Sequence, residues 1–172
     1  MSIDRLKELP KETLIGMIED FAKNWLAHDG LWFQAVEKEA GMATAIKLDT
    51  EVWEAFTKIE AKRIMARHNI PENGGLEALK KALGFRLYAV LNEQEITEET
   101  ANSFVFKMVD CRVQSARKRK KLPLFPCKLV GIVEYTEFAR TIDPRIKTEC
   151  IACPPDPDER DFYCGWKFSI EE

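Results

Sequence analysis

The sequence predicts a single α+β domain over residues 1–172, with an N-terminal helical array followed by a small antiparallel sheet and one helix packed on it. The first reason is a change of period: apolar residues recur at three- and four-residue steps through residues 1–95 and alternate in residues 103–172. The second is composition, because 45% hydrophobic and 32% charged residues are typical of a folded globular chain. The third is length, since 172 residues without a long linker suit one domain.

Three amphipathic helices are expected in the first half of the chain. The first covers residues 10–40, with a kink or tight break near Gly30 and a stop at Gly41. The second begins at residues 49–50, an Asp and a Thr that can both cap a helix, and ends before Pro71. The expected inward-facing residues are Leu14, Met17, Ile18, Phe21, Trp25 and Leu26 in the first helix, Val52, Phe56, Ile59, Ile64 and Met65 in the second, and Leu76, Leu79, Leu83, Leu87, Val90 and Leu91 in the third.

The second half predicts strands and one further helix. A strand is expected over residues 104–114, and the basic run 117–121 then leads into a loop. A helix is expected over residues 127–141, a strand over residues 145–152 and a last strand over residues 162–170. Four residues are predicted to share one face of the last strand: Phe162, Cys164, Trp166 and Phe168. This order of elements predicts an antiparallel sheet packed against helices.

Charge and hydropathy indicate a cytosolic protein. The N-terminal segment is charged throughout and unlike a signal peptide, and no stretch reaches the roughly 20 apolar residues that cross a bilayer. The basic run 117–121 could contact nucleic acid, but it contains no aromatic residue, and a solvated loop explains it better. The expected partner is therefore a small-molecule ligand rather than a membrane or a nucleic acid, and a homo-oligomer is left open.

Five cysteines carry the strongest functional signal, and all of them follow residue 110. A reducing cytosol disfavours structural disulfides, so clustered cysteines there bind metal or do redox chemistry more often. Cys150 and Cys153 form a Cys-x-x-Cys pair that can hold one tetrahedral ion. Cys164 follows across a turn, and Cys127 starts a helix whose dipole favours a thiolate. These four residues are the predicted metal ligands, with zinc the expected ion and iron the alternative.

Two other interpretations of the cysteines stay open. Free cysteine often fills a protein core without any chemistry, and a Cys-x-x-Cys pair can also cycle between dithiol and disulfide. Cys111 is assigned to the core, because it would lie on one strand face with Val105, Val109 and Val113.

Two further groups are candidates for chemistry. His28 precedes Asp29 between two tryptophans, so it could serve as a general base or metal ligand in an aromatic pocket; alternatively, it packs at a helix end. Arg112 and Gln114 follow apolar residues on one strand face, and together with Trp32 they are the candidates for substrate binding. The alternative is that these polar side chains are solvated. The sequence contains no glycine-rich phosphate loop, Gly-x-Ser-x-Gly or His-Glu-x-x-His motif.

Several segments resemble a group of uncharacterised cytosolic proteins from anaerobic microbes. They are WLAHDGLWF at residues 25–33, DCRVQSAR at residues 110–117, FPCK at residues 125–128 and IDPRIKTECIACPPD at residues 142–156. The resemblance covers most of the chain.

More distantly, the C-terminal third is similar to the 2-aminothiazoline-4-carboxylate hydrolase family. The shared outline is Cys127 at a helix start, Arg145 and Thr148 on a strand, and a final Cys-x-aromatic-x-Phe strand at residues 164–168. The Cys-x-x-Cys pair lies outside this outline. The resemblance implies a small α+β domain with a ligand or metal site at the cysteines.

The preferred function is a metal- or small-molecule-binding domain with a C-terminal cysteine site. The second hypothesis is a hydrolase of a small heterocycle that uses a cysteine thiolate or His28, so enzyme activity is left open. The third is a regulatory protein that binds an anion or nucleic acid through Arg112 and Arg117.

Overall fold

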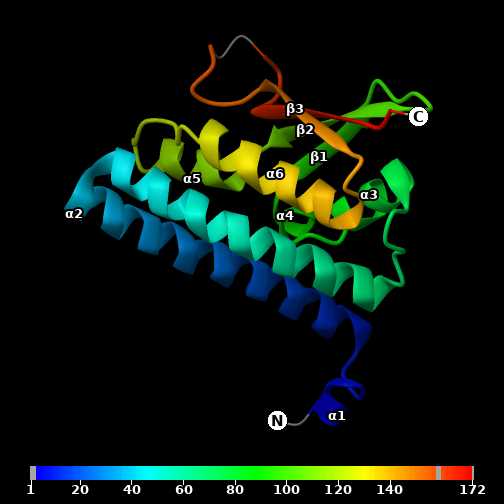
Figure 1. The fold of residues 1–172 in the computed structure, drawn as a ribbon. Coiled ribbons are helices and arrows are strands. Elements are labelled where there is room, and N and C mark those ends of the chain that lie inside the picture. The colour runs from blue at the N-terminus through cyan, green and yellow to red at the C-terminus, as the bar shows by residue number, and fades with distance from the viewer. Residues whose placement is uncertain (1–2, 158–159, 172) are drawn as a thin grey trace.

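The computed structural model describes residues 3–157 and 160–171. The predicted α+β class is confirmed: a long helix and short helices are followed by a small sheet with interspersed helices. The helix α6 lies between the long helix α2 and the sheet, and α1 extends away from the rest (Figure 1). The elements are α1 (Ile3–Leu6), α2 (Lys11–His68), α3 (Gly75–Leu83), α4 (Leu87–Leu91), β1 (Glu93–Thr97), β2 (Ser103–Asp110), α5 (Arg112–Arg119), α6 (Lys128–Ile142), β3 (Lys147–Ala152) and β4 (Cys164–Ser169).

The helix α2 is a hairpin that bends at Gly41. Gly41 has φ 82° and ψ 163°, a conformation that glycine adopts readily, and the two arms lie side by side (Figure 1). The expected helix stop at Gly41 is thus confirmed. The predicted break near Gly30 is wrong, because the helix continues through it and the Gln34 side chain donates to its carbonyl at 2.6 Å. The predicted start at residues 49–50 is also wrong, since the second arm begins directly after the bend.

Only one side of the α2 hairpin is buried. Ile18, Phe21, Val52 and Ile59 were expected to face inward but are between 51% and 64% exposed. The second arm packs on α6 through a neighbouring stripe instead, where the Thr57 hydroxyl donates to a backbone carbonyl of α6 at 3.1 Å. The buried residues of this arm are Ala45, Trp53, Thr57, Ala61, Ile64 and Met65. Neither α2 nor any other helix of the described residues has a stretch long and apolar enough to cross a membrane.

The expected third helix is divided in two around Gly84. α3 ends just before Gly84, and Arg86 is extended with φ -69° and ψ 153° before α4 begins. The end of α6 fixes the start of α3, because the Asp143 carboxylate accepts the backbone N–H of Gly75 at 3.0 Å. As expected, α2 ends before Pro71.

The four strands form one antiparallel sheet in the order β1-β2-β4-β3. The sequence analysis missed β1. The predicted strand over residues 104–114 is too long, because β2 ends at Asp110 and Arg112 begins α5, where its backbone N–H donates to the Asn92 side chain at 2.9 Å. The basic run 117–121 therefore lies at the end of α5 and not wholly in a loop.

The last strand carries its predicted apolar face with one correction. Cys164, Trp166 and Phe168 are all buried on the side that faces α6. Phe162 lies before β4 and over the other face, because a Cβ added to Gly165 would approach its ring to 3.0 Å. The strand begins only at Cys164, so the alternation does not reach Phe162.

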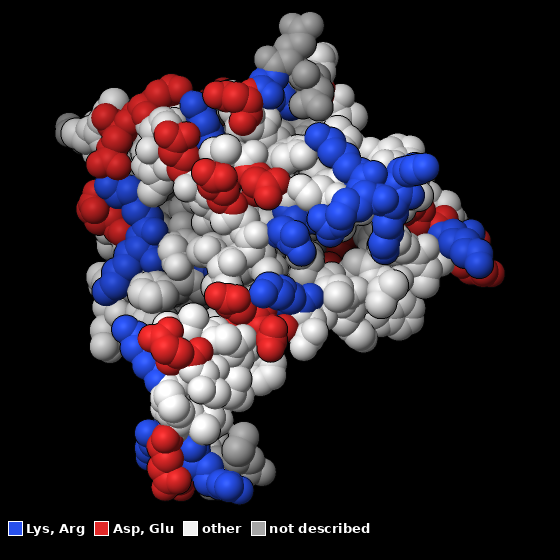
Figure 2. Space-filling model, turned by 180° about the vertical axis from the view of Figure 1, so that it is seen from behind, with Lys and Arg blue, Asp and Glu red and all other residues white. Residues whose placement is uncertain are grey.

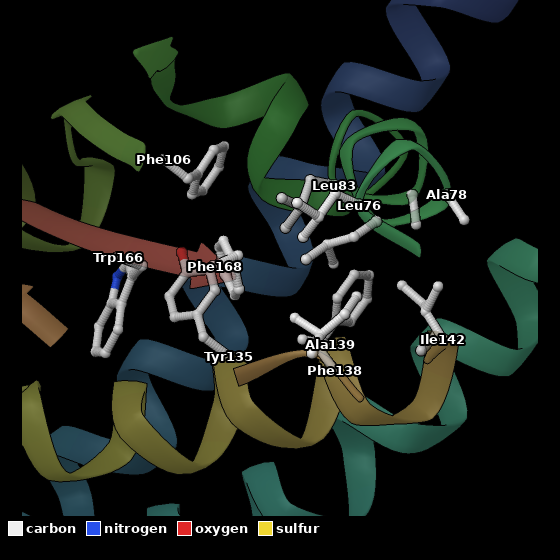
Figure 3. Close-up of a cluster of buried hydrophobic side chains, with 14 of the residues drawn as sticks. Leu76, Ala78, Leu83, Phe106, Tyr135, Phe138, Ala139, Ile142, Trp166 and Phe168 are labelled. Carbon is white, nitrogen blue, oxygen red and sulfur yellow. The ribbon is translucent and has the colours of Figure 1, made fainter. Parts of the chain in front are cut away.

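The main core lies between α6, α3 and the sheet. Side chains of Tyr135, Phe138 and Ile142 point from α6 towards residues of α3 and β4 (Figure 3). The Tyr135 ring stacks on Trp166 with centroids 4.7 Å apart. Each large apolar side chain buried here contributes about 1.5–3 kcal/mol to folding. Cys153 and Cys164 belong to this core, and Cys111, Cys127 and Cys150 pack against it.

Candidate functional site

Two adjoining cavities lie between the α2 hairpin, α4, α5 and the start of α6. The outer cavity has a volume of about 410 Å³, and the inner one has a volume of about 70 Å³. They meet at four residues that line both: Trp53, Tyr88, Val113 and Phe125. The outer cavity reaches the surface beside α5, and basic side chains gather on one side of the face seen in Figure 2.

Aromatic rings form the junction between the cavities. Trp53 and Tyr88 are stacked, with centroids 5.9 Å apart and an interplanar angle of 20°. Phe33 meets Phe125 edge-on at 4.7 Å. Trp25, expected on the apolar side of α2, packs edge-on against Trp53 at 6.1 Å and so supports this wall from behind. Flat apolar walls of this kind favour a flat apolar ligand.

Two carboxyl groups line the outer cavity, one from each arm of α2. Burial, followed by the nearby charges of Asp29 and Glu134, raises the pKa of Asp49 to about 7 against the opposing effect of a hydrogen bond with Trp53. Burial likewise raises the pKa of Asp29, and His28 opposes that shift. Both carboxyl groups thus lie in surroundings that disfavour negative charge.

Most basic groups of the outer cavity already have partners. Arg117 is buried and grips the Glu37 carboxylate with two nitrogens at 2.8 and 3.0 Å. Lys120 donates to the Gln34 side chain at 2.9 Å. The guanidinium of Arg112 is half-buried and makes no hydrogen bond or ion pair within residues 3–157 and 160–171. Arg112 is therefore a half-buried cation of this cavity that is available to bind an anion; Arg119, which also lines the cavity and has no partner among the described residues, is exposed.

The inner cavity is lined by thiols. Its cysteines are Cys111, Cys127, Cys153 and Cys164. Gln114 holds the loop before α6 in place: its side chain donates to the Phe125 carbonyl at 2.8 Å and accepts the Phe125 N–H at 2.9 Å. The same amide lies 3.6 Å from the Cys127 sulfur. The substrate-binding residue predicted at position 114 thus lines the inner cavity and positions a cysteine.

Cys153 joins the predicted metal ligands into one cluster. The sulfurs of Cys127 and Cys153 lie 3.5 Å apart. Hydrogen bonds with the thiols of Cys127, Cys150 and Cys164 raise the pKa of Cys153. The fold therefore gathers all four predicted ligands from the start of α6, from β3 and its following turn, and from β4.

The thiols differ in acidity. Burial raises the pKa of Cys111 to about 12. A hydrogen bond with Cys153 lowers the pKa of Cys150, and the charges of Lys128 and Arg160 lower it further against the effect of burial. Lys128 is held at this end of α6 by Asp156, with both carboxylate oxygens at 2.9 Å. Since the thiolate is the nucleophile and the metal ligand, Cys150 is the cysteine best prepared for either role.

All five cysteines are free. Within the described part of the chain, no group of three or more His, Cys, Asp or Glu side chains is disposed to hold a metal ion.

A buried ion pair lies behind the inner cavity. Arg86 is 2% exposed, and its guanidinium contacts Glu134 at 2.6 Å and Glu60 at 2.9 Å. The guanidinium also lies 4.7 Å from the centre of the Phe138 ring. Glu134 lines the inner cavity, so this pair brings fixed charge close to the thiols.

The predicted catalytic residue His28 and the predicted substrate-binding residue Trp32 lie outside the cavities. His28 and Trp32 are exposed on the first arm of α2, and Trp32 is 65% exposed. Neither lines either cavity in the described structure, whereas Asp29, the neighbour of His28, does. Sequence reasoning missed Asp49, although an acid one helical turn before the buried Trp53 was a usable signal.

Comparison with known proteins assigns the chain to a family. Residues 7–170 match the family of unknown function DUF6125, so the chain belongs to that family. This agrees with the expectation of an uncharacterised group. No curated protein and no solved structure matches the chain. Neither the resemblance to 2-aminothiazoline-4-carboxylate hydrolases nor an anaerobic source finds support in these comparisons.

Proposed function

We propose that this protein binds a small organic molecule in the outer cavity and presents one end of it to the thiols of the inner cavity. The family has no known function and so assigns no activity. The observation that carries the proposal is the junction at which Trp53, Tyr88, Val113 and Phe125 line both cavities. A ligand lying along these rings would reach the sulfur atoms without crossing a wall.

The dimensions of the cavities support this proposal. Small-molecule sites in proteins typically have volumes of roughly 300–1,000 Å³, with apolar walls and a few polar groups. The outer cavity, at about 410 Å³, falls within that range, and its lining combines aromatic and aliphatic side chains with charged groups. The inner cavity, at about 70 Å³, has room for one functional group of a ligand.

The free thiols are consistent with the expected cytosolic location, where cysteines stay reduced. An enzyme that uses a cysteine thiolate on a small heterocycle would act in the same inner cavity. In that case a cysteine, and not the exposed His28, would be the reacting group.

Binding is tested with 8-anilinonaphthalene-1-sulfonate, a flat aromatic anion whose fluorescence rises in apolar surroundings. Ala116→Phe places a ring in the outer cavity, and Ala66→Phe adds the same ring to an exposed position near the end of α2. The wild type and Ala66→Phe should bind one equivalent, whereas Ala116→Phe should bind roughly tenfold more weakly or not at all. Equal binding by a folded Ala116→Phe variant would contradict the proposal.

Access to the thiols is tested by labelling with N-phenylmaleimide and peptide mapping. A saturating concentration of the anilinonaphthalene probe should slow labelling of Cys111 and Cys127, which line the inner cavity. Labelling of Cys150, which lines neither cavity in the described structure, should stay unchanged and serves as the internal control. Equal slowing of the labelling of all three cysteines would indicate a general conformational change and not occupation of the cavity.

A second candidate function is a thiolate metal centre formed by Cys127, Cys150, Cys153 and Cys164, with zinc the expected ion and iron the alternative. Its support is the hydrogen bonding of Cys153 to the other three thiols. Metal binding would require the Cys153 sulfur to turn outward so that four thiolates surround the ion at about 2.3 Å.

The metal centre is tested by elemental analysis of protein purified without added metal and by titration with Co²⁺, whose thiolate complexes absorb strongly. One equivalent of metal should be retained by the wild type and by Cys111→Ser, whose sulfur is not among the four. Cys150→Ser and Cys153→Ser should lose it. A folded wild type that contains no metal and shows no Co²⁺ thiolate absorption would rule out the metal centre.

A further inference from the structure

Charges of opposite sign from different helices line the outer cavity. Asp29 and Asp49 belong to the two arms of α2, whereas Arg112 begins α5. No nitrogen of Arg112 comes within 4.0 Å of either carboxylate in the described structure, although all three residues border the same space. The cavity therefore separates Arg112 from two acids with which it could otherwise form ion pairs.

In the described structure neither acid forms an ion pair, and the nearby cation is the neighbouring His28, whose charge lowers the pKa of Asp29. Of the basic residues in the cavity lining, Arg117 pairs with Glu37, and Lys23 pairs with Glu19 at 3.2 Å. A half-buried carboxylate without a cation is costly, and that cost falls when a positively charged group comes between the two acids. A neutral or purely anionic ligand would leave this cost in place.

The inner cavity gives an independent sign of a polar occupant. Trp166 is 1% exposed, and its indole N–H has no hydrogen-bond partner among the described residues. This ring lines the inner cavity together with the thiols. Buried N–H donors are nearly always paired in folded proteins, so an acceptor from a ligand or from ordered water belongs at this end.

We infer that the outer cavity takes a small amphoteric molecule, with its anionic group at Arg112, a basic nitrogen between Asp29 and Asp49, and a hydrogen-bond acceptor on its body that reaches the indole N–H of Trp166 in the inner cavity. The inference rests on the function proposed above and names the ligand class of that site. The aromatic rings of Trp53 and Tyr88 would hold the flat body between the two charged ends. The basic nitrogen would donate to the carboxylates, and Arg112 would hold a carboxylate or phosphate through its planar fork of donors.

Three related probes test this ligand class by calorimetry or by competition with the anilinonaphthalene probe. They are 4-(aminomethyl)benzoate, benzylamine and benzoate, which carry both charges, the positive charge alone and the negative charge alone. The amphoteric probe should bind roughly tenfold more tightly than either of the others, because it alone makes charge-assisted hydrogen bonds at both ends.

Isosteric variants identify which wall binds which charge. Asp49→Asn and Asp29→Asn should weaken the binding of 4-(aminomethyl)benzoate and benzylamine by roughly tenfold and leave the binding of benzoate unchanged. Arg112→Gln should weaken the binding of 4-(aminomethyl)benzoate and benzoate by roughly tenfold and leave that of benzylamine unchanged. Glu51→Gln and Lys121→Gln are the matched controls, because both side chains are exposed and line neither cavity in the described structure. Retained binding of the anilinonaphthalene probe by the aspartate variants reports that they are folded.

Two results would overturn the inference. The amphoteric probe could bind no more tightly than benzoate or benzylamine, or the aspartate variants could bind the amines as the wild type does. If the anilinonaphthalene probe still binds in either case, the proposed small-molecule function stands and only the ligand class is wrong. Failure of the wild type to bind that probe would instead contradict the proposed function itself.

Discussion

The thiols of Cys150 and Cys153 share a hydrogen bond, yet their acidities shift in opposite directions. That bond lowers the pKa of Cys150, whereas hydrogen bonds with three other thiols raise the pKa of Cys153. The thiol of Cys153 therefore keeps its proton and helps the half-buried thiol of Cys150 to ionise. Three thiols favour the protonated form of Cys153, and Cys153 in turn favours the thiolate of Cys150. The cluster is therefore chemically asymmetric even before any ligand binds.

In metal-free protein, Cys150 should be the first cysteine to react with iodoacetamide at pH 7, and Cys111, whose pKa is about 12, should be among the slowest. The thiolate is the reacting form, so the order of rates follows the order of acidities. Time-resolved peptide mapping by mass spectrometry measures each rate. Lys128→Gln should slow Cys150 by removing a favourable charge, while Lys121→Gln, an exposed control, should not. A single slow rate for all five cysteines would exclude this asymmetry.

The Asp49 carboxyl should make the ligand-free protein less stable as the pH rises. Its folded pKa of about 7 exceeds its ordinary value of 3.8, so the fold favours the protonated form. Its stabilising contribution is complete below pH 3.8 and is lost as the pH rises through about 7. Asp49→Asn should therefore increase the free energy of unfolding at pH 8 by about 1–2 kcal/mol and change little at pH 4.

Urea denaturation at both pH values measures this effect. Glu51→Gln, which removes an exposed acid from the same arm of α2, is the control and should show no such difference. A wild type and an Asp49→Asn variant with the same pH dependence would show that Asp49 ionises normally in the folded protein.

Arg86 should be among the most costly residues to replace. It is 2% exposed, and it neutralises Glu60 and Glu134, so its loss leaves two carboxylates without a cation. Arg86→Met should lower the free energy of unfolding by about 3–5 kcal/mol. Arg63→Met, at an exposed position of α2, is the matched control and should cost less than about 0.5 kcal/mol.

A double variant separates the lost charge from the lost packing. Adding Glu134→Gln to Arg86→Met should restore part of the stability, because one unpaired carboxylate disappears. If Arg86→Met costs no more than Arg63→Met, or if the second substitution only adds damage, the ion pair is not what stabilises this part of the fold.

The fold class could be predicted because the apolar period changes along the chain, but the faces of α2 could not. Ile18 and Phe21 have helical spacing with their apolar neighbours, yet that spacing fixes only which residues share a stripe. A helix that bends back at Gly41 has several apolar stripes, and α6 is its main packing partner. Which stripe is buried depends on that tertiary contact, which is not a local property of the sequence.

One part of the candidate site could likewise be predicted from the sequence, and another part could not. Cys150 and Cys153 are close in sequence, and the turn to β4 brings Cys164 near, so their clustering follows from local patterns. The outer cavity instead requires the two arms of α2 to face α5, and Asp29, Asp49 and Arg112 meet across long sequence separations. His28 was singled out because histidine is a common catalytic residue, while its neighbour Asp29 faces the cavity one helical step away.

Gly131 allows α6 to approach Trp166 closely, and its replacement should disturb the inner cavity. A Cβ at this position would lie 2.7 and 2.9 Å from two ring carbons of Trp166, which is 1% exposed and cannot easily move. Gly131→Ala should therefore lower the free energy of unfolding by about 1–3 kcal/mol, despite the better helix propensity of alanine.

Gly16→Ala is the matched control, because it lies in α2 with nothing within 4 Å of the added Cβ. It should raise the free energy of unfolding by about 0.5–1 kcal/mol, since alanine loses less conformational entropy in a helix. Denaturant titration followed by circular dichroism measures both changes. Because Gly131 and Trp166 line the inner cavity, Gly131→Ala should also change the labelling rate of Cys127, and Gly16→Ala should not. A stabilising effect at both positions would mean that α6 can move away from the sheet, and the inner cavity would then not be a rigid chamber.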